Sequence, residues 1–260
     1  MKLGIVQGRL LEPIDDLIQE FPYDNWEKEL KTLDRLGLSG VEWIITNKHF
    51  EDNPIFGDSF KFFNLITSVC LDNLITKKIH DKEYLVKILE KLCMLESVKS
   101  INIPILEESS MEDGQQRKEF ITILKEFGDR FPDTNFLYEA ELGLEEYLEI
   151  IHSRNNFFAT YDTGNLTSYG ANHTEYINAL NNKIRCVHIK DRNVEGETKE
   201  LFQGDTDFDE IFYSLNNINY DGLFTLQLQR GLRGNEINTV NDQINKIKIL
   251  HGKYFKTRQE

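Results

Sequence analysis

Eight short apolar runs that alternate with amphipathic segments constrain the fold of this chain more than any other feature. Successive runs begin 22 to 39 residues apart, which is too far for hairpins and is typical of strand–helix–strand units. Such an alternation leaves two architectures, a closed (β/α)8 barrel and an open doubly wound sheet. The predicted strands are Leu3–Arg9, Gly40–Ile45, Asn64–Asp72, Ser100–Leu106, Asn135–Leu142, Phe157–Asp162, Ile184–Asp191 and Leu223–Arg230.

The segment after the first predicted strand decides between these architectures. An open sheet usually has a glycine-rich phosphate loop here, either G-x-G-x-x-G or a Walker loop. Residues 7–13 read Gln-Gly-Arg-Leu-Leu-Glu-Pro and match neither motif. We therefore predict an α/β fold of the (β/α)8 TIM barrel type. The 260 residues are mostly used by one such barrel and no linker interrupts them, so we expect a single domain over residues 1–260.

The connecting segments differ in how clearly they predict helices. The clear helices, with apolar residues at helical spacing, are Trp26–Leu36, Lys82–Leu95, Arg117–Phe127, Leu144–His152, Asp207–Leu215 with Asp207 as its cap, and Thr239–His251. The segment Thr46–Phe62 contains Asn53-Pro54 and Gly57, and we expect a long loop with a short helix there. His173–Asn182 is a short and weak helix prediction.

The charge balance of the chain is strongly acidic. It has 30 Lys and Arg against 44 Asp and Glu, which gives a formal net charge of −14. Such a chain repels nucleic acids and anionic membrane surfaces unless it carries a local basic patch, so we expect neither as a partner. A small anionic substrate is still compatible, because it responds to the local field at its site.

The expected compartment follows from what the sequence lacks. The N-terminal segment has no apolar core of a signal peptide, and no stretch approaches the roughly 18 apolar residues of a membrane span. Cys70, Cys93 and Cys186 make an odd count without a C-x-x-C pair, which predicts reduced and mostly buried thiols. We therefore expect a cytoplasmic protein. The sequence carries no signal for the oligomeric state, and a homo-oligomer stays open.

Polar residues at the C-terminal ends of the predicted strands carry the functional information. Strands of a parallel barrel are covered on both faces and should be apolar, and active sites of such barrels lie at the C-terminal ends. Because an unpartnered buried polar group is costly, polar residues that recur at this end predict a shared polar cavity. These residues are Gln7, Arg9, Glu139, Glu141, Asp162, His188 and Gln227.

Three of these residues together suggest a metal site. Glu139, Asp162 and His188 offer two carboxylate oxygens and one imidazole nitrogen, a donor set that suits Mn, Mg, Co or Zn. Gln227 could add a carbonyl oxygen. Structural interpretations stay open, because a strand histidine is more often hydrogen-bonded in the core, and Asp162 could form a turn with residues 163–165.

Cationic residues are expected at the same end of the barrel. In so acidic a chain, cations there suit a phosphate or carboxylate group of a substrate. With equal weight, they could pair with nearby acids such as Asp191 and Glu139, while Glu141 could cap the helix predicted nearby. The cations are Arg9, Lys190, Arg192 and Arg230.

Several motifs at these positions resemble one family. The motifs are Gly4-Ile5-Val6-Gln7-Gly8-Arg9-Leu10, Tyr161-Asp162-Thr163-Gly164-Asn165, Val187-His188-Ile189-Lys190-Asp191-Arg192, Leu201-Phe202-Gln203-Gly204-Asp205-Thr206-Asp207-Phe208 and Tyr220-Asp221-Gly222. With them the chain resembles, over nearly its whole length, the sugar phosphate isomerase/epimerase superfamily of xylose isomerase-like TIM barrels. The motifs are fairly specific for this superfamily and carry little information on the substrate.

The resemblance implies a divalent metal held by Glu139, Asp162, His188 and Gln227, the last standing where many members have glutamate. In such enzymes the metal polarises the carbonyl of an open-chain ketose or aldose. A carboxylate then removes the neighbouring proton, and the resulting enediolate is reprotonated. The implied function is a sugar or sugar-phosphate isomerase or epimerase.

Gln227 changes what the resemblance implies. An amide does not titrate, so it cannot act as a second base, and it lowers the charge of the ligand set from −3 to −2. We therefore predict single-base chemistry with Glu139 or Glu141 as the base, and we favour Glu139. The expected catalytic residues are Glu139, Glu141 and Lys190, and the expected substrate-binding residues are Gln7, Arg9, Asn165, Asp191, Arg192 and Arg230.

Three other functions compete on the same barrel. A dehydratase acting on a polyol or keto acid would begin with the same proton abstraction. An endonuclease acting on abasic DNA would need more metal-binding histidines and a basic groove, which the net charge of −14 disfavours. A non-catalytic sugar or metabolite binder that has lost the metal is the alternative that Gln227 favours.

Overall fold

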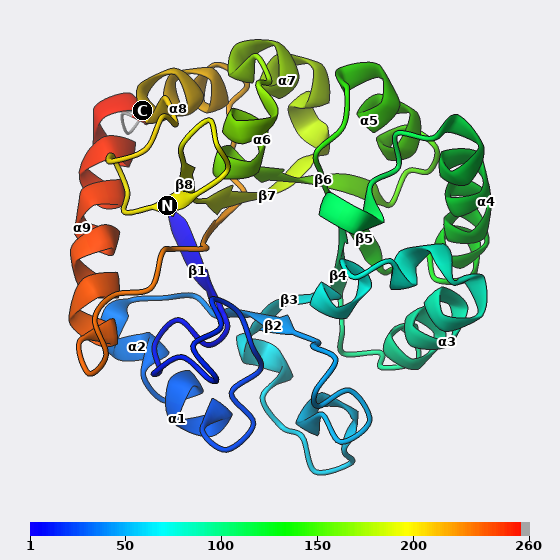
Figure 1. Cartoon of the computed structure of the whole chain (residues 1–260), viewed down its shortest axis with the longest axis horizontal. Coiled ribbons are helices and arrows are strands. Elements are labelled where there is room, and N and C mark those ends of the chain that lie inside the picture. Colours follow the sequence, from blue (N-terminus) through cyan, green and yellow to red (C-terminus); the bar gives the residue numbers. More distant parts are fainter. Residues whose placement is uncertain (256–260) are drawn as a thin grey trace, which may run out of the picture.

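The predicted strands close into a parallel barrel in the computed structural model of the chain, which describes residues 1–255. The order around the barrel is β1-β10-β7-β6-β5-β4-β3-β2, and β10 closes it against β1 (Figure 1). The barrel strands are β1 (Lys2–Val6), β2 (Val41–Ile44), β3 (Ile66–Cys70), β4 (Ser100–Ile105), β5 (Asn135–Ala140), β6 (Phe157–Asp162), β7 (Ile184–Ile189) and β10 (Leu223–Leu226). The predicted (β/α)8 TIM barrel is thus confirmed.

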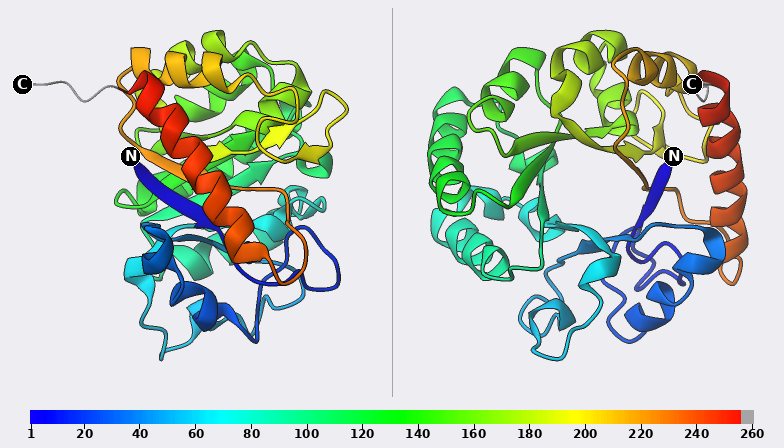
Figure 2. Two further views of the ribbon diagram at one scale, coloured as in Figure 1. Left: turned by 90° about the vertical axis from the view of Figure 1, so that its left-hand side faces the viewer. Right: turned by 180° about the vertical axis from the view of Figure 1, so that it is seen from behind.

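Helices surround the barrel on its outer side (Figures 1 and 2). They are α1 (Trp26–Leu30), α2 (Leu33–Leu36), α3 (Lys82–Cys93), α4 (Gly114–Arg130), α5 (Leu144–Ile151), α6 (Thr163–Tyr169), α7 (His173–Leu180), α8 (Phe208–Asn217) and α9 (Glu236–Tyr254). Short 3-10 turns are η1 (Pro54–Phe56), η2 (Phe63–Leu65), η3 (Asp72–Leu74), η4 (Lys78–His80), η5 (Glu107–Ser109) and η6 (Asn181–Lys183). A small antiparallel hairpin of β8 (Asp191–Arg192) and β9 (Thr198–Lys199) follows β7.

The helix predicted over residues 26–36 is interrupted and forms α1 and α2 instead. Thr32, at the break, donates its hydroxyl to the backbone carbonyl of Lys28 at 2.9 Å. A side-chain bond of this type competes with the helix ladder and bends helices. Gly37 then ends α2 in the left-handed conformation, with a φ of 65°.

The two weak connections agree with their predictions, and one helix was missed. A long loop containing η1 follows β2, and α7 occupies the segment with the weak helix pattern. Helix α6 was not predicted, because Gly164 and Asn165 are poor helix formers. It begins directly after β6, and Asp162 caps it by accepting a hydrogen bond from the backbone N–H of Asn165 at 2.7 Å.

The alternation along each strand separates outward apolar side chains from inward polar ones. On β5, the ring of Tyr138 faces outward and lies 5.2 Å from the ring of Phe157. Glu139, the next residue, therefore points into the barrel. Thr160 on β6 also points inward, where its hydroxyl donates to the side chain of Asn102 at 2.9 Å. Several strands thus bring polar groups into one interior space.

The remaining predictions concern the chain as a whole. Cys70, Cys93 and Cys186 are free and buried, as predicted. Within residues 1–255, no helix is long and apolar enough to cross a membrane. The barrel strands extend from Lys2 to Leu226. That residues 1–260 form a single domain stays a prediction.

Tyr147 fixes helix α5 to β5 and β6. Its buried hydroxyl donates to the backbone carbonyls of Tyr138 and Thr160, at 2.6 and 3.2 Å. We expect Tyr147→Phe to lower the free energy of unfolding by about 1 kcal/mol, because it removes this buried donor. Urea unfolding followed by circular dichroism measures the loss. The control Tyr213→Phe removes an exposed hydroxyl and should change stability by less than about 0.5 kcal/mol; equal losses in both variants would contradict the prediction.

Candidate metal centre

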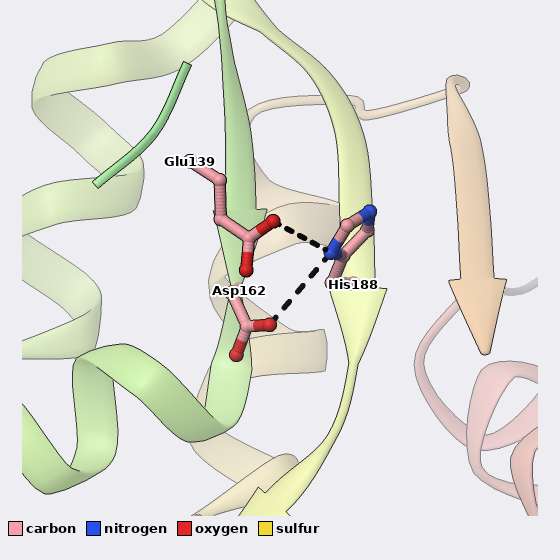
Figure 3. A group of neighbouring side chains, drawn as sticks. All are labelled: Glu139, Asp162 and His188. Atoms are coloured by element: carbon pink, nitrogen blue, oxygen red, sulfur yellow. Dashed lines mark ion pairs between the residues drawn. The ribbon is translucent and has the colours of Figure 1, made fainter. Parts of the chain in front are cut away.

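Glu139, Asp162 and His188 lie together in the barrel interior, as the sequence predicted (Figure 3). They come from the adjacent strands β5, β6 and β7, and all three side chains are buried. Nδ1 of His188 is 3.3 Å from Oε2 of Glu139 and 3.7 Å from Oδ2 of Asp162. One ligand atom from each residue lies within 4.8 Å of the others.

The polar atoms of this group fit a divalent cation. Nδ1 of His188 and Oδ2 of Asp162 are buried, and neither has a hydrogen-bond partner among the described residues. Buried polar atoms without partners are rare, and they often mark an ion or water site. Two carboxylate oxygens and an imidazole nitrogen are ligands that Zn, Mn and Co share. These three residues could therefore hold a metal ion.

Two amides support the Glu139 carboxylate. The side-chain amide of Asn102 donates to Oε2 at 3.2 Å, and that of Asn165 donates to Oε1 at 2.8 Å. Asn165 also accepts a hydrogen bond from Nζ of Lys190 at 2.9 Å. Asn165 and Lys190, two residues singled out in the sequence, thus contact this candidate metal-site group directly or through one another.

The buried charges of the group shift each other's pKa. Burial alone would raise the pKa of Asp162, but Lys190, whose Nζ is 3.5 Å away, and His188 outweigh it and hold this pKa below its usual value. Burial alone would lower the pKa of His188. The carboxylates of Glu42 and Glu139 outweigh burial there and raise this pKa well above its usual value.

Glu42 is a buried carboxylate that the sequence analysis missed. It lies on β2, and its Oε1 is 3.2 Å from Nε2 of His188. Its Oε2 accepts a hydrogen bond from the hydroxyl of Ser68 at 2.6 Å. The available signal was a single acid between the apolar residues Val41 and Trp43 in a buried strand. Glu42 lies inside its strand and not at the C-terminal end, so the expectation of polar strand ends did not include it.

Gln227 and Gln7 lie at the ends of the neighbouring strands β10 and β1. Nε2 of Gln227 contacts Oε1 of Gln19 at 3.5 Å, while its own Oε1 is buried without a hydrogen-bond partner among the described residues. Oε1 of Gln7 accepts from the backbone N–H of Ile44 at 3.1 Å. The role of Gln227 as a metal ligand stays a prediction, and so does the role of Gln7 in substrate binding.

Two of the predicted substrate-binding arginines hold the loop between β1 and α1. Arg230 donates to the backbone carbonyls of Gly8, Leu11 and Ile18, at 2.8, 3.0 and 2.9 Å. Arg9 is buried and also donates to the carbonyl of Ile18. These contacts give both arginines a structural role, and their binding of substrate stays a prediction.

A buried acid of α1 anchors the start of the same loop. The carboxylate of Glu29 accepts hydrogen bonds from the backbone N–H groups of Gly8 at 2.8 Å and Leu10 at 3.1 Å. Burial raises the pKa of Glu29 to about 7. Gly8 has a φ of 88°, a conformation that L side chains rarely adopt. Glu29 therefore binds the backbone N–H groups of the turn after β1, and Arg230 binds its carbonyl groups.

Glu141 and Arg192 form a pair at the rim of the barrel. Nη1 of Arg192 is 3.3 Å from Oε1 of Glu141. Burial raises the pKa of Glu141, and Arg192 only partly opposes this shift. Nε of Arg192 is buried and has no hydrogen-bond partner among the described residues. The cation pairs with a local acid, although with Glu141 rather than the expected Asp191 or Glu139.

Asp191 shapes the loop after β9. Its carboxylate accepts hydrogen bonds from the backbone N–H groups of Gln203, Gly204 and Thr206, at 3.1, 2.9 and 3.3 Å. A Cβ at Gly204 would lie 2.3 Å from Oδ1 of Asp191, so only glycine fits this close approach. The structure thus gives Asp191 a structural task, and its contact with substrate stays a prediction.

A family profile described as the xylose isomerase-like TIM barrel matches residues 89–248, which is more than half of the chain. The chain belongs to the xylose isomerase-like TIM barrel family. The matched segment contains Glu139, Asp162 and His188, and also Gln227. The family resemblance seen in the sequence is therefore confirmed.

Solved structures share this xylose isomerase-like barrel at low identity. A structure of IOLI protein with a binding zinc atom has a TM-score of 0.70 and 19% identity, and the match covers 99% of this chain and 100% of that one. L-ribulose 3-epimerase has a TM-score of 0.70 and 13% identity, with both chains fully covered. D-psicose 3-epimerase from Clostridium cellulolyticum H10, with D-tagatose, has a TM-score of 0.66 and 14% identity, covering 99% and 100%. These identities support a shared fold alone. A search of curated proteins found no match.

This xylose isomerase-like barrel has a second polar group at its mouth that the sequence analysis missed. Asp72 follows β3, and its Oδ1 accepts a hydrogen bond from Nε2 of Gln19 at 2.7 Å. Gln19 also accepts from Arg9 at 3.1 Å and contacts Gln227. Gln19 therefore links the ends of β1, β3 and β10. Asp72 ended a predicted strand and was a usable signal, whereas Gln19 lies in an irregular loop that the pattern does not describe.

Asp72 should make the stability of the protein depend on pH. Burial raises the pKa of Asp72 from an ordinary value of 3.8 to about 7. Between these values the unfolded chain releases this proton and the folded chain keeps it, so the contribution of Asp72 to stability falls as pH rises from about 4 to about 7. We therefore expect the stability of Asp72→Asn minus that of wild type to be larger at pH 8 than at pH 4.

Urea unfolding at both pH values measures this difference. Asp58→Asn, the same change at an exposed position, is the control and should show no such dependence. Parallel stability curves for wild type and Asp72→Asn would overturn the assignment.

Proposed function

We propose that this protein is a metal-dependent sugar or sugar-phosphate isomerase or epimerase that acts on an open-chain ketose or aldose. The observation that carries the proposal is the buried group of Glu139, Asp162 and His188, with unpartnered atoms of Asp162 and His188 facing each other. Support also comes from fold relatives whose names describe sugar 3-epimerases. Zinc in the IOLI structure favours a divalent ion.

A bound divalent ion would polarise the substrate carbonyl, acidify the neighbouring C–H and stabilise the enediolate. The chain's own residues would then move the proton. Glu139 is the proposed base, and the amides of Asn102 and Asn165 hold its carboxylate in place. Glu141 is the second candidate, because its raised pKa makes it a stronger base. Gln227 cannot titrate, so the proposal is single-base chemistry.

The proposed substrate can carry an anionic group. Arg9 and Arg192 each keep a buried Nε–H without a partner among the described residues, and an oxygen of a phosphate or carboxylate could accept from it. Lys190 lies 2.9 Å from Asn165, close to the proposed base, and could help to orient the substrate. The same proton abstraction could instead lead to loss of water, so products of dehydration belong in the same assay.

The proposal predicts proton exchange at the carbon beside the carbonyl. Protein loaded with Mn²⁺ should introduce deuterium from D₂O into one or more members of a panel of ketoses and ketose phosphates. Glu139→Gln should slow this exchange by roughly 10²- to 10⁴-fold, because it removes the base. Mass spectrometry of the recovered sugars measures deuterium and identifies isomerised, epimerised or dehydrated products.

Two matched variants sharpen this test. Glu145→Gln makes the same change at an exposed position of α5 and should leave exchange unchanged. Glu141→Gln tests the second candidate base. Because Glu139 is also a proposed metal ligand, the two variants are compared only after metal analysis shows that both carry Mn²⁺, and the larger loss then identifies the group that takes the proton. Full turnover by Glu139→Gln would contradict the assignment of Glu139 as the base. A protein that binds sugar without exchange or turnover would favour the non-catalytic binder.

A further inference from the structure

His188 has carboxylates at both of its ring nitrogens. Nδ1 faces Glu139 and Asp162, at 3.3 and 3.7 Å, and Nε2 faces Glu42 on the opposite side of the ring, at 3.2 Å. In Figure 3 the dashed contacts of Glu139 and Asp162 converge on one nitrogen, and the other points away from them. The contact with Glu42 has the distance of an ion pair without the alignment of a hydrogen bond.

Glu42 is placed to act on His188. Both side chains are buried, and among residues 1–255 no Lys or Arg lies within ion-pair distance of Glu42. Ser68 holds the other carboxylate oxygen at 2.6 Å, which leaves Oε1 directed to the imidazole. Burying a carboxylate without a paired cation costs desolvation free energy, unless another buried group interacts favourably with its charge. His188 is that partner.

The charge of the site gives Glu42 a second task. The proposed ligands Glu139 and Asp162 carry a charge of −2, because Gln227 is neutral. With Glu42, these three carboxylates carry a formal charge of −3, which a divalent ion and Lys190 together balance when His188 is neutral. Glu42 thereby restores, through His188, the negative charge that a glutamate at position 227 would have supplied.

We infer that Glu42 is a positioning residue of the metal centre: it keeps the proton of His188 on Nε2, so that Nδ1 presents its lone pair to the ion beside Glu139 and Asp162. This rests on the metal site of the proposed function. Histidine ligands generally donate their second N–H to such a partner, which fixes the ring and raises its basicity. Losing the partner typically weakens metal binding by 10- to 100-fold.

Metal affinity tests this role directly. Isothermal titration of metal-free protein with Mn²⁺ and Zn²⁺ should give a Kd about 10- to 100-fold weaker for Glu42→Gln than for wild type. The matched control is Glu29→Gln, which makes the same change at another buried acid that contacts backbone N–H groups of the β1 turn instead of His188. Its Kd should match that of wild type. Equal affinities of wild type and Glu42→Gln would overturn the inference.

A spectroscopic measurement on the wild-type protein does not depend on the variant folding. Long-range ¹H–¹⁵N correlation spectra of the Zn²⁺-loaded protein should show the proton of His188 on Nε2 and the metal at Nδ1. The opposite tautomer would overturn the inference even if Glu42→Gln were unfolded. In a folded Glu42→Gln protein, a shift of the Nε2–H resonance is expected, which a merely structural role would not produce at His188.

The two proposals fail in different ways. Wild-type protein that binds neither ion in titration would overturn the proposed metal site and this inference together. Wild-type protein that binds an ion, with unchanged affinity in Glu42→Gln, would overturn only the role of Glu42. Ser68→Ala removes the hydroxyl that holds Glu42 and should weaken binding by less than Glu42→Gln, because the carboxylate remains.

Discussion

Burying carboxylates inside a barrel is the constraint on which the centre of this structure depends. An isolated carboxylate in such an interior would be protonated or expelled, because its desolvation costs several kcal/mol. Here Asp162 and Glu139 remain buried because cations and amide donors face them. His188 contacts both acids, Lys190 contacts Asp162, and Asn165 donates to Glu139. The interior is therefore a charge network that a divalent ion would complete.

The elements around the network are arranged to serve it. Helix α6 begins immediately after β6, so that Asp162 caps the helix with Oδ1 and leaves Oδ2 facing His188. The side chain of Asn165, in the first turn of α6, reaches back to Glu139. A longer connection between β6 and α6 would separate these roles. The segment 163–165 is therefore helical although Gly164 and Asn165 are poor helix formers. The hydrogen bonds of Asp162 and Asn165 hold the first turn of α6 in place directly after β6.

The sequence predicted the barrel and the grouping of Glu139, Asp162 and His188, because parallel strands place their C-terminal ends together and side chains alternate along them. It did not predict Glu42, whose acid lies in the middle of its strand, although one charge in a buried run was a usable signal. Asp72 ended a predicted strand and was a usable signal, but its contact with Gln19 could not be predicted, because Gln19 lies in an irregular loop 53 residues away along the chain. The break at Thr32 depended on one local hydrogen bond, which helical periodicity does not reveal.

The local charge at the mouth differs from what the net charge of −14 suggests. Arg9 and Arg230 mainly bind backbone carbonyls of the β1–α1 loop, and Arg192 pairs with Glu141. Arg9 and Arg230 thus already hold the β1–α1 loop, and Arg192 is already paired with an acid. A phosphate would have to gain more from the free Nε–H groups than it disturbs, whereas a neutral sugar would leave these contacts intact. In the proposed function, the partnerless Nε–H groups of Arg9 and Arg192 are therefore the places where a substrate anion could bind without displacing these contacts.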